Sequence, residues 1–162
     1  MEPIMTPRLR TPAGSALTDL ILDLFRLNNR VLAAGDRLIS GLGLTSGRWQ
    51  VLGTIVAAER AQPVAWLARD MGANRQNVQR IVNDLERDGL VMFKPNPHHK
   101  RAQLVVLTDE GRGRFDAAMK LQAPWVNDLA EGLPVEAIET TRCTMAALLR
   151  RLEGHGEADG QD

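Results

Sequence analysis

The stretch from Gly72 to Gly89, GANRQNVQRIVNDLERDG, divides into an apolar side and a polar side if it forms a helix. At about 100° per residue its large apolar side chains point in nearly one direction. These residues are Val78, Ile81, Val82 and Leu85. Amides and guanidiniums cover the rest of the surface, and no carboxylate precedes Asp84. Such a helix can bury only one narrow face, so the fold must leave its hydrogen-bonding side chains exposed.

The segments on either side of this helix predict a winged helix-turn-helix. The segment before it, VAWLARDMG, predicts a short helix that closes at Gly72. After it, LVMFKP and AQLVVLT are β-branched and apolar runs that flank NPHHKR, and together they predict a hairpin. A short helix, a tight turn, a polar-faced helix and a hairpin follow one another in this motif.

Apolar residues also recur at helical spacing in the part of the chain that precedes the motif. Ser15 is the predicted N-cap of a first helix, which runs until the glycines at Gly41 and Gly43. With about 25 residues and a length of roughly 37 Å, this helix is too long to bury itself in a small domain. Thr45 is expected to cap a second helix that packs Trp49 inward.

Two further helices are expected after the motif. Thr108 is the predicted cap of a long helix in which Pro124 should cause a kink or an interruption. Gly132 and Pro134 break the chain before a last helix that presents apolar residues on one side.

The expected fold class is mainly α, an α+β winged helix-turn-helix with six helices and a two-stranded β-hairpin wing that dimerises through its terminal helices. We divide the chain into a flexible N-terminal arm (1–14), an N-terminal dimerisation helix (15–44), a winged helix-turn-helix domain (45–107), C-terminal dimerisation helices (108–152) and a disordered acidic tail (153–162). The terminal helices carry more apolar surface than one winged domain can cover, so two copies are expected to pack together. The alternative is that these helices form an intramolecular cap.

Composition excludes several classes of protein. No apolar run approaches the roughly 20 residues needed to cross a bilayer, and the N-terminus lacks the apolar core of a signal peptide. The lone cysteine, Cys143, fits a reducing compartment, so we expect a cytoplasmic protein without membrane contact. The sequence has no HExxH, CxxC, glycine-rich phosphate loop or GxSxG, so we expect no enzyme activity, cofactor or metal.

Charge is sorted along the chain, although 20 basic and 20 acidic residues give a net charge of zero. Residues 74–83 and 92–107 contain cations and no acid, whereas the last residues are acidic. Arginine can bond both guanine O6 and N7, and Asn or Gln can bond adenine N6 and N7. We therefore predict that the polar helix reads bases in a major groove; its candidate residues are Asn74, Arg75, Gln76, Asn77, Gln79, Arg80 and Asn83.

We predict that the hairpin tip is a wing whose cations contact phosphates or the minor groove. Its candidate residues are Lys94, His98, His99, Lys100 and Arg101. The alternatives are that the polar side of the helix is a solvated surface without a partner and that the hairpin tip is an ordinary soluble turn. Adjacent histidines point apart and have no third ligand nearby, so we expect hydrogen-bonding groups rather than a metal site.

These motifs resemble those of the MarR family of transcriptional regulators over roughly residues 15–152. LGLTSGRWQVLGTI, WLARDMGANRQNVQRIVNDLERDGLV and NPHHKRAQLVVLTDEGR are similar to that family's second helix, helix-turn-helix and wing in order and spacing. The resemblance implies a homodimer, joined by its first and last helices, that binds a pseudo-palindromic operator in double-stranded DNA. It also implies a repressor that a small, often aromatic effector or cysteine oxidation releases.

Residue by residue, the resemblance makes Asn74 the cap of the recognition helix and Arg101 the wing arginine. This sequence has His99 where the family usually has an aspartate that braces that arginine, so Arg101 is expected to be oriented differently or held less firmly. Val64 replaces the Ser or Thr that commonly opens the helix before the turn, which weakens a cap.

Effector and redox control are implied by the resemblance alone. Trp49 is the candidate contact in an effector pocket, and Trp66 and Trp125 are weaker ones, although tryptophans at helical spacing are more often core residues. Cys143 has no resolving partner in its own chain, so a packed cysteine is the simpler interpretation. A protein-interaction module that has lost DNA binding is the alternative function, but the stretch 74–83 lacks the apolar or aromatic anchors of such a surface.

Overall fold

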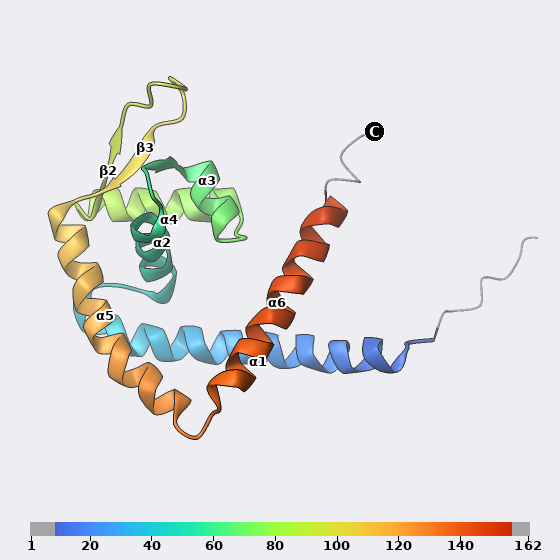
Figure 1. Cartoon of the computed structure of the whole chain (residues 1–162). Coiled ribbons are helices and arrows are strands. Elements are labelled where there is room, and N and C mark those ends of the chain that lie inside the picture. The colour runs from blue at the N-terminus through green and yellow to red at the C-terminus, as the bar shows by residue number, and fades with distance from the viewer. Residues whose placement is uncertain (1–8, 157–162) are drawn as a thin grey trace, which may run out of the picture. The chain divides into compact units, whose positions relative to one another are not determined.

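Residues 9–156 are described by the computed structural model of the chain, with side chains described as far as Gly154. They form six α-helices, a short 3-10 helix and a small antiparallel sheet (Figure 1). The chain divides into two units, residues 1–122 and 123–162, and the first holds the whole winged motif. The predicted arm lies partly, and the end of the predicted tail wholly, outside the described residues. No helix in the described range is long and apolar enough to span a membrane.

Helix α1 (Pro12–Ile39) begins before the predicted cap at Ser15. The Thr11 hydroxyl accepts a hydrogen bond from the Gly14 amide at 3.0 Å, and Pro12 occupies the first turn. A hydroxyl cap followed by proline is a stronger start signal than a serine inside the helix, and this overrides our prediction. A 3-10 helix, η1 (Ser40–Leu42), follows and ends at Gly43 with φ of +64°.

The helix-turn-helix occupies its predicted positions. Thr45 caps α2 (Ser46–Ala57) by accepting from the Arg48 amide at 3.3 Å. Helix α3 (Val64–Asp70) has no side-chain cap, because its N-cap residue is Pro63, whose side chain has no hydrogen-bond acceptor. Val64, where we expect a weakened cap, is the first helical residue. Helix α4 (Arg75–Arg87) follows the turn at Gly72, whose φ is +60°.

The sheet contains one more strand than the sequence predicts. Strands β2 (Val91–Lys94) and β3 (Leu104–Leu107) form the expected hairpin, with Lys94 opposite Leu104. Strand β1 (Gln62–Pro63) pairs on the other side of β3, so the strand order is β1-β3-β2. Two residues, one of them proline, carry no alternation of polarity that could identify a strand.

Helix α5 (Asp109–Ala130) starts where Thr108 accepts a hydrogen bond from the Gly111 amide at 3.0 Å, which confirms the predicted cap. It runs through Pro124, so the expected interruption is absent. A proline inside a helix costs about 3 kcal/mol through a lost hydrogen bond and a clash with the carbonyl four residues earlier, and the turns on both sides of Pro124 keep their own hydrogen bonds. Helix α6 (Val135–Gly156) extends beyond residue 152, so the first residues of the predicted tail are helical.

The core of the first unit holds α4 by its apolar side. The side chains of Val78, Val82 and Leu85 have 0% exposure, and that of Ile81 has 9%. They join a cluster that includes Val51, Leu52, Leu67, Leu90, Val91 and Val105 from the elements around them. Burial of each such side chain contributes about 1.5–3 kcal/mol. Helix α4 is therefore anchored to α2, α3 and β2 through one face, while the other faces outward.

Candidate nucleic-acid interface

The N-terminus of α4 is capped by Asn74. Its side-chain oxygen accepts hydrogen bonds from the amides of Gln76, at 2.9 Å, and Asn77, at 3.2 Å. Two of the helix's unpaired donors are thereby satisfied, and the Asn74 NH₂ group remains exposed. The predicted cap is therefore present, and the side-chain oxygen of Asn74 is used within its own helix.

The outward face of α4 carries the predicted base-reading side chains. All but one of them are exposed, namely Asn74, Arg75, Gln76, Asn77, Arg80 and Asn83, while Gln79 is half-buried. Arg80 Nη2 donates to Asn77 Oδ1 at 2.9 Å, and Gln79 Nε2 donates to Asn83 Oδ1 at 2.9 Å. These bonds between successive turns hold the side chains over the helix surface. A guanidinium has five N–H donors, so Arg80 keeps most of them for a partner.

The first carboxylate of α4, Asp84, lies between two arginines of the same helix. Its oxygens are 3.9 Å from Arg80 Nη1 and 3.0 Å from Arg87 Nη1. Because both neighbours are cationic, Asp84 adds little repulsion toward a polyanion. The outward face of α4 from Asn74 to Asn83 therefore offers donors and acceptors but no negative charge.

The wing is a loop, residues 95–103, between β2 and β3, and it projects away from the helices (Figure 1). Asn96 organises it: Nδ2 donates to the Ala102 carbonyl at 2.9 Å, and Oδ1 accepts from the His98 amide at 3.0 Å. All five predicted wing residues are exposed, namely Lys94, His98, His99, Lys100 and Arg101. The role of Asn96 was missed, although an Asn-Pro pair is a recognised turn signal.

A hollow of about 520 Å³ lies between α4 and the wing. Arg75, Gln79 and Asn83 line it from the helix, and His99 and Arg101 line it from the wing. Among the described residues, the Arg101 side chain has no hydrogen bond or ion pair, which agrees with the loss of a bracing aspartate at position 99. The remaining predicted residues do not line this hollow. They lie on α4 and the wing, except for Asn74, which is the N-cap of α4, and Lys94, which ends β2.

The tryptophans of the first unit differ in their surroundings. Trp49 is half-buried and packs against the core. Trp66, on α3, is 42% exposed and borders a second cavity of about 600 Å³ beside the wing. The guanidinium carbons of Arg60 and Arg69 lie 5.8 and 5.4 Å from the centre of its ring. Trp66 and Arg69 are three residues apart on α3 and are therefore neighbours on its surface, a signal that our sequence analysis did not use. Arg60 precedes the helix, and no local pattern pairs it with Trp66.

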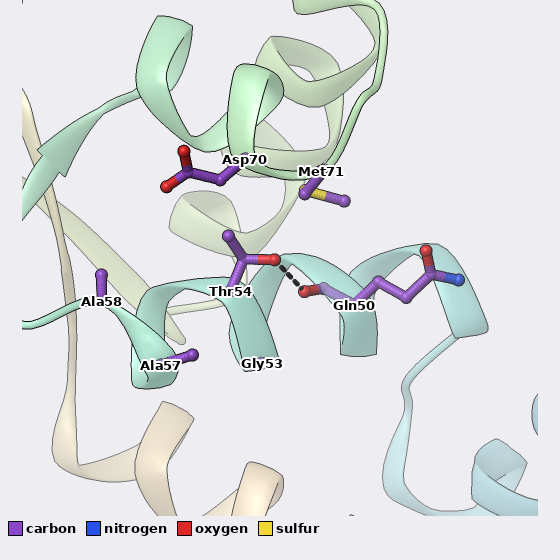
Figure 2. Close-up of a pocket in the computed structure, with 7 residues that line it drawn as sticks. All are labelled: Gln50, Gly53, Thr54, Ala57, Ala58, Asp70 and Met71. Carbon is purple, nitrogen blue, oxygen red and sulfur yellow. Dashed lines mark hydrogen bonds between the residues drawn. The ribbon is translucent and has the colours of Figure 1, made fainter. Parts of the chain in front are cut away.

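A third hollow, of about 460 Å³, lies between α2 and the end of α3 (Figure 2). Figure 2 shows Gln50 and Thr54 on α2, with Asp70 and Met71 above them, and the Thr54 hydroxyl donates to the Gln50 carbonyl at 2.9 Å. The Asp70 carboxylate disfavours an anionic ligand here. The cavity beside Trp66, which no carboxylate lines, suits an anion better.

Comparisons with known proteins agree with this geometry. A family model described as MarR family matches residues 42–102. An uncharacterised protein of Mycobacterium tuberculosis is 34% identical over 134 residues, which cover 83% of this chain and 92% of that protein. The transcriptional activatory protein BadR of Rhodopseudomonas palustris is 33% identical over 95 residues, 57% of this chain and 54% of that protein.

Solved structures share the fold over most of the chain. CouR from Rhodococcus jostii RHA1, bound to p-coumaroyl-CoA, has a TM-score of 0.72 and 25% identity, and the match covers 80% of this chain and 91% of CouR. A MarR-family regulator from Rhodococcus sp. RHA1 has a TM-score of 0.71 and 25% identity, and that match covers 81% and 92%. MarR proteins are transcriptional regulators rather than enzymes, which confirms the prediction that the chain is not an enzyme. The winged helix-turn-helix, the capped recognition helix and these matches together show that the chain belongs to the MarR family of transcriptional regulators.

Proposed function

We propose that the protein binds double-stranded DNA in a sequence-specific manner with α4 in the major groove, and that it regulates transcription in the cytoplasm as a homodimeric repressor. The single observation that carries this proposal is the outward face of α4, which is polar, free of carboxylates from Asn74 to Asn83 and exposed. A helix of this kind fits the width of the major groove and supplies the donors and acceptors that base edges require.

Arg75, Gln76 and Arg80 are the side chains best placed for base contacts. All three are exposed, and they lie in the N-terminal half of α4, the part of a recognition helix that reaches furthest into the groove. The Arg80–Asn77 hydrogen bond leaves the outer donors of the guanidinium available for guanine O6 and N7. Gln79 donates one N–H to the Asn83 oxygen, which leaves Gln79 Oε1 and Asn83 Nδ2 for a partner.

Wing cations are proposed to contact the DNA backbone. Lys94, Lys100 and Arg101 are exposed, and the Asn96 hydrogen bonds hold the loop that carries the last two. Phosphate contacts add affinity without sequence preference, and each releases about one counterion. The hollow between Arg75 and Arg101 is cationic on both sides and is a suitable place for a phosphate.

Homodimer formation is proposed because α1 and α6 both carry exposed apolar side chains. On α1, Phe25 is 62% and Leu27 is 56% exposed; on α6, Leu149 is 58% and Leu152 is 71% exposed. Helices with this much uncovered apolar surface are stabilised by a second copy. A two-fold dimer would place two copies of α4 about 34–36 Å apart and so match a pseudo-palindromic operator.

Effector control is the second part of the proposal. CouR, whose fold this chain shares, is described with a coenzyme A thioester of an aromatic acid. Trp49 stays a predicted contact, and the exposed ring of Trp66 with Arg60 beside it offers a further place for an aromatic anion. Quenching of tryptophan fluorescence by p-coumarate or p-coumaroyl-CoA, lost in Trp66→Phe but not in Trp49→Phe, would favour the cavity beside the wing. The reverse pattern would favour the predicted contact.

The experiment that tests DNA binding is selection of duplexes from a random pool, followed by anisotropy titrations of the selected and scrambled duplexes. Lys100→Ala should weaken binding to both duplexes alike and reduce the slope of log affinity against log salt by about one unit. Arg112→Ala, which removes an exposed cation from α5, is the matched control and should change neither. Failure to enrich any duplex would refute the proposal and would favour a protein-interaction module.

Repression is tested with the selected duplex placed across a promoter. Transcription in vitro should fall as the protein is added, and it should recover when the duplex is supplied in excess. An increase in transcription would identify an activator instead.

A further inference from the structure

We infer that Arg48 is a positioning residue that fixes the angle between recognition helix α4 and the end of α1. Its guanidinium bridges two parts of the fold: Nη1 donates to the Gly43 carbonyl at 3.0 Å, and Nη2 pairs with the Asp88 carboxylate. Gly43 follows η1 at the end of α1, whereas Asp88 is the C-cap of α4. One side chain thus joins the proposed dimerisation helix to the proposed DNA-reading helix.

The α1 side of this bridge is held by independent contacts. Arg114 Nη1 donates to the Leu42 carbonyl at 2.8 Å, so two adjacent carbonyls of the turn each accept a bond from a guanidinium. The Ser46 amide donates to Asp36 at 2.6 Å, and the Ser46 hydroxyl donates to the Leu32 carbonyl at 2.8 Å. The end of α1, η1 and the start of α2 therefore form a fixed corner against which Arg48 can position another element.

The α4 side of the bridge is the end of the helix, where a contact has the greatest leverage. Asp88 donates its backbone amide to the Asp84 carbonyl at 3.1 Å, so its side chain moves with the last turn of α4. A helix of 13 residues is about 20 Å long, and a small displacement of this end tilts the base-reading end in the opposite direction. The polar bonds at the other end, from Asn74, stay within α4 and do not fix its orientation.

The energetics favour a geometric role for Arg48 over a stabilising one. The Arg48 side chain is 18% exposed, and within the described residues its buried Nε has no hydrogen-bond acceptor. An unsatisfied buried donor offsets much of what the ion pair contributes. Arg48→Met leaves Asp88 without its partner, but the Asp88 side chain is 51% exposed and stays hydrated, so no buried charge is left uncompensated. Arg48→Met should therefore fold well and still lose the bridge.

The consequence for DNA binding rests on the proposed function. If α1 lies in the dimer interface, the angle between α1 and α4 sets the separation and relative tilt of the two recognition helices. A dimer without the bridge would still bind each half-site but would discriminate less between operators of different spacing. Arg48 would then determine specificity without contact to DNA.

The first test measures this angle without DNA. Nitroxide labels at Arg30→Cys on α1 and Glu86→Cys on α4, in a Cys143→Ser background, report the distance between the helices when labelled chain is diluted with unlabelled chain. Pulsed electron resonance should give a narrow distribution for the parent and a broader or displaced one for Arg48→Met and Asp88→Asn. Arg37→Met, which removes an exposed arginine from α1 outside the bridge, should match the parent. An unchanged distribution in Arg48→Met would overturn the inference, whatever the protein does with DNA.

The second test uses the duplex selected by the parent protein, with one base pair added to or removed from its centre, and a duplex that carries one half-site. Arg48→Met should bind the half-site within about twofold of the parent, while its preference for the selected spacing falls by about tenfold, a typical coupling between neighbouring groups. Arg48→Lys, which keeps a charge that can pair with Asp88, should restore part of the preference. Equal losses on every duplex would indicate a merely structural residue and would refute the inference, whereas failure to select any duplex would refute the proposed function alone.

Discussion

Gly111→Ala tests the packing that supports the wing. Gly111 is buried in the first turn of α5, and a Cβ atom built there would lie 1.9 Å from the Leu90 carbonyl oxygen and 2.9 Å from the Leu90 carbonyl carbon. That oxygen is held in place because it accepts a hydrogen bond from the Thr108 amide at 3.1 Å. Neither atom belongs to a flexible side chain, so α5 and the start of β2 must separate by about 1 Å to admit the methyl group.

Overpacking of a well-packed site costs about 1–3 kcal/mol and occasionally more. Because the clash is with backbone, we expect Gly111→Ala to lower the free energy of unfolding by about 3 kcal/mol, the upper end of that range. Gly113→Ala is the matched control, since nothing lies within 4 Å of its Cβ position two residues further along the same helix. It should raise stability by about 0.5–1 kcal/mol through helix propensity.

The assay is urea unfolding followed by far-ultraviolet circular dichroism at equal protomer concentrations, since dimer formation would make stability depend on concentration. The urea concentration at the unfolding midpoint should be lower than that of the parent for Gly111→Ala and higher for Gly113→Ala. If Gly111→Ala unfolded at the same urea concentration as Gly113→Ala, the close approach of α5 to the Leu90 carbonyl would be wrong.

Three further predictions follow from other contacts. Asn74→Ala should lower the free energy of unfolding by about 1 kcal/mol through loss of the α4 cap, measured in the same urea assay, and a result equal to the parent would contradict the capping role. Phe25→Glu should convert a dimer of about twice 17.8 kDa into monomer in sedimentation at micromolar concentration, and a persistent dimer would exclude this part of α1 from the interface. Asp36→Ala should cost about 1–2 kcal/mol by removing the acceptor of the Ser46 amide, and an unchanged melting temperature would show that this corner is not held by the carboxylate.

The features that the sequence predicts well are those set by neighbours in the chain. The period of Val78, Ile81, Val82 and Leu85 predicts the buried face of α4, and all four are buried. Hydroxyl caps at Thr45 and Thr108 act on amides three residues away, so a short pattern is enough to find them. The wing was found because two β-branched runs flank a loop rich in proline and cations.

The features that the sequence did not predict depend on contacts between distant residues. Arg48 and Asp88 are 40 positions apart, and Arg114 and Leu42 are 72 apart, so no local pattern pairs them. Strand β1 exists only because β3 offers it an edge, since two residues have too little propensity of their own. The cavity beside Trp66 could not be predicted either, because its walls come from segments that are distant in the sequence: α3, the segment before β1 and the wing.

The most direct test of the account is a base-by-base scan of the selected duplex with the parent and Arg80→Ala. We expect the parent to lose affinity at defined base pairs, and Arg80→Ala to bind the selected duplex more weakly by about 1–3 kcal/mol while becoming indifferent to the base at one position in each half-site. If Arg80→Ala and the parent gave the same profile of base preference, the outward face of α4 would not be the surface that reads the sequence.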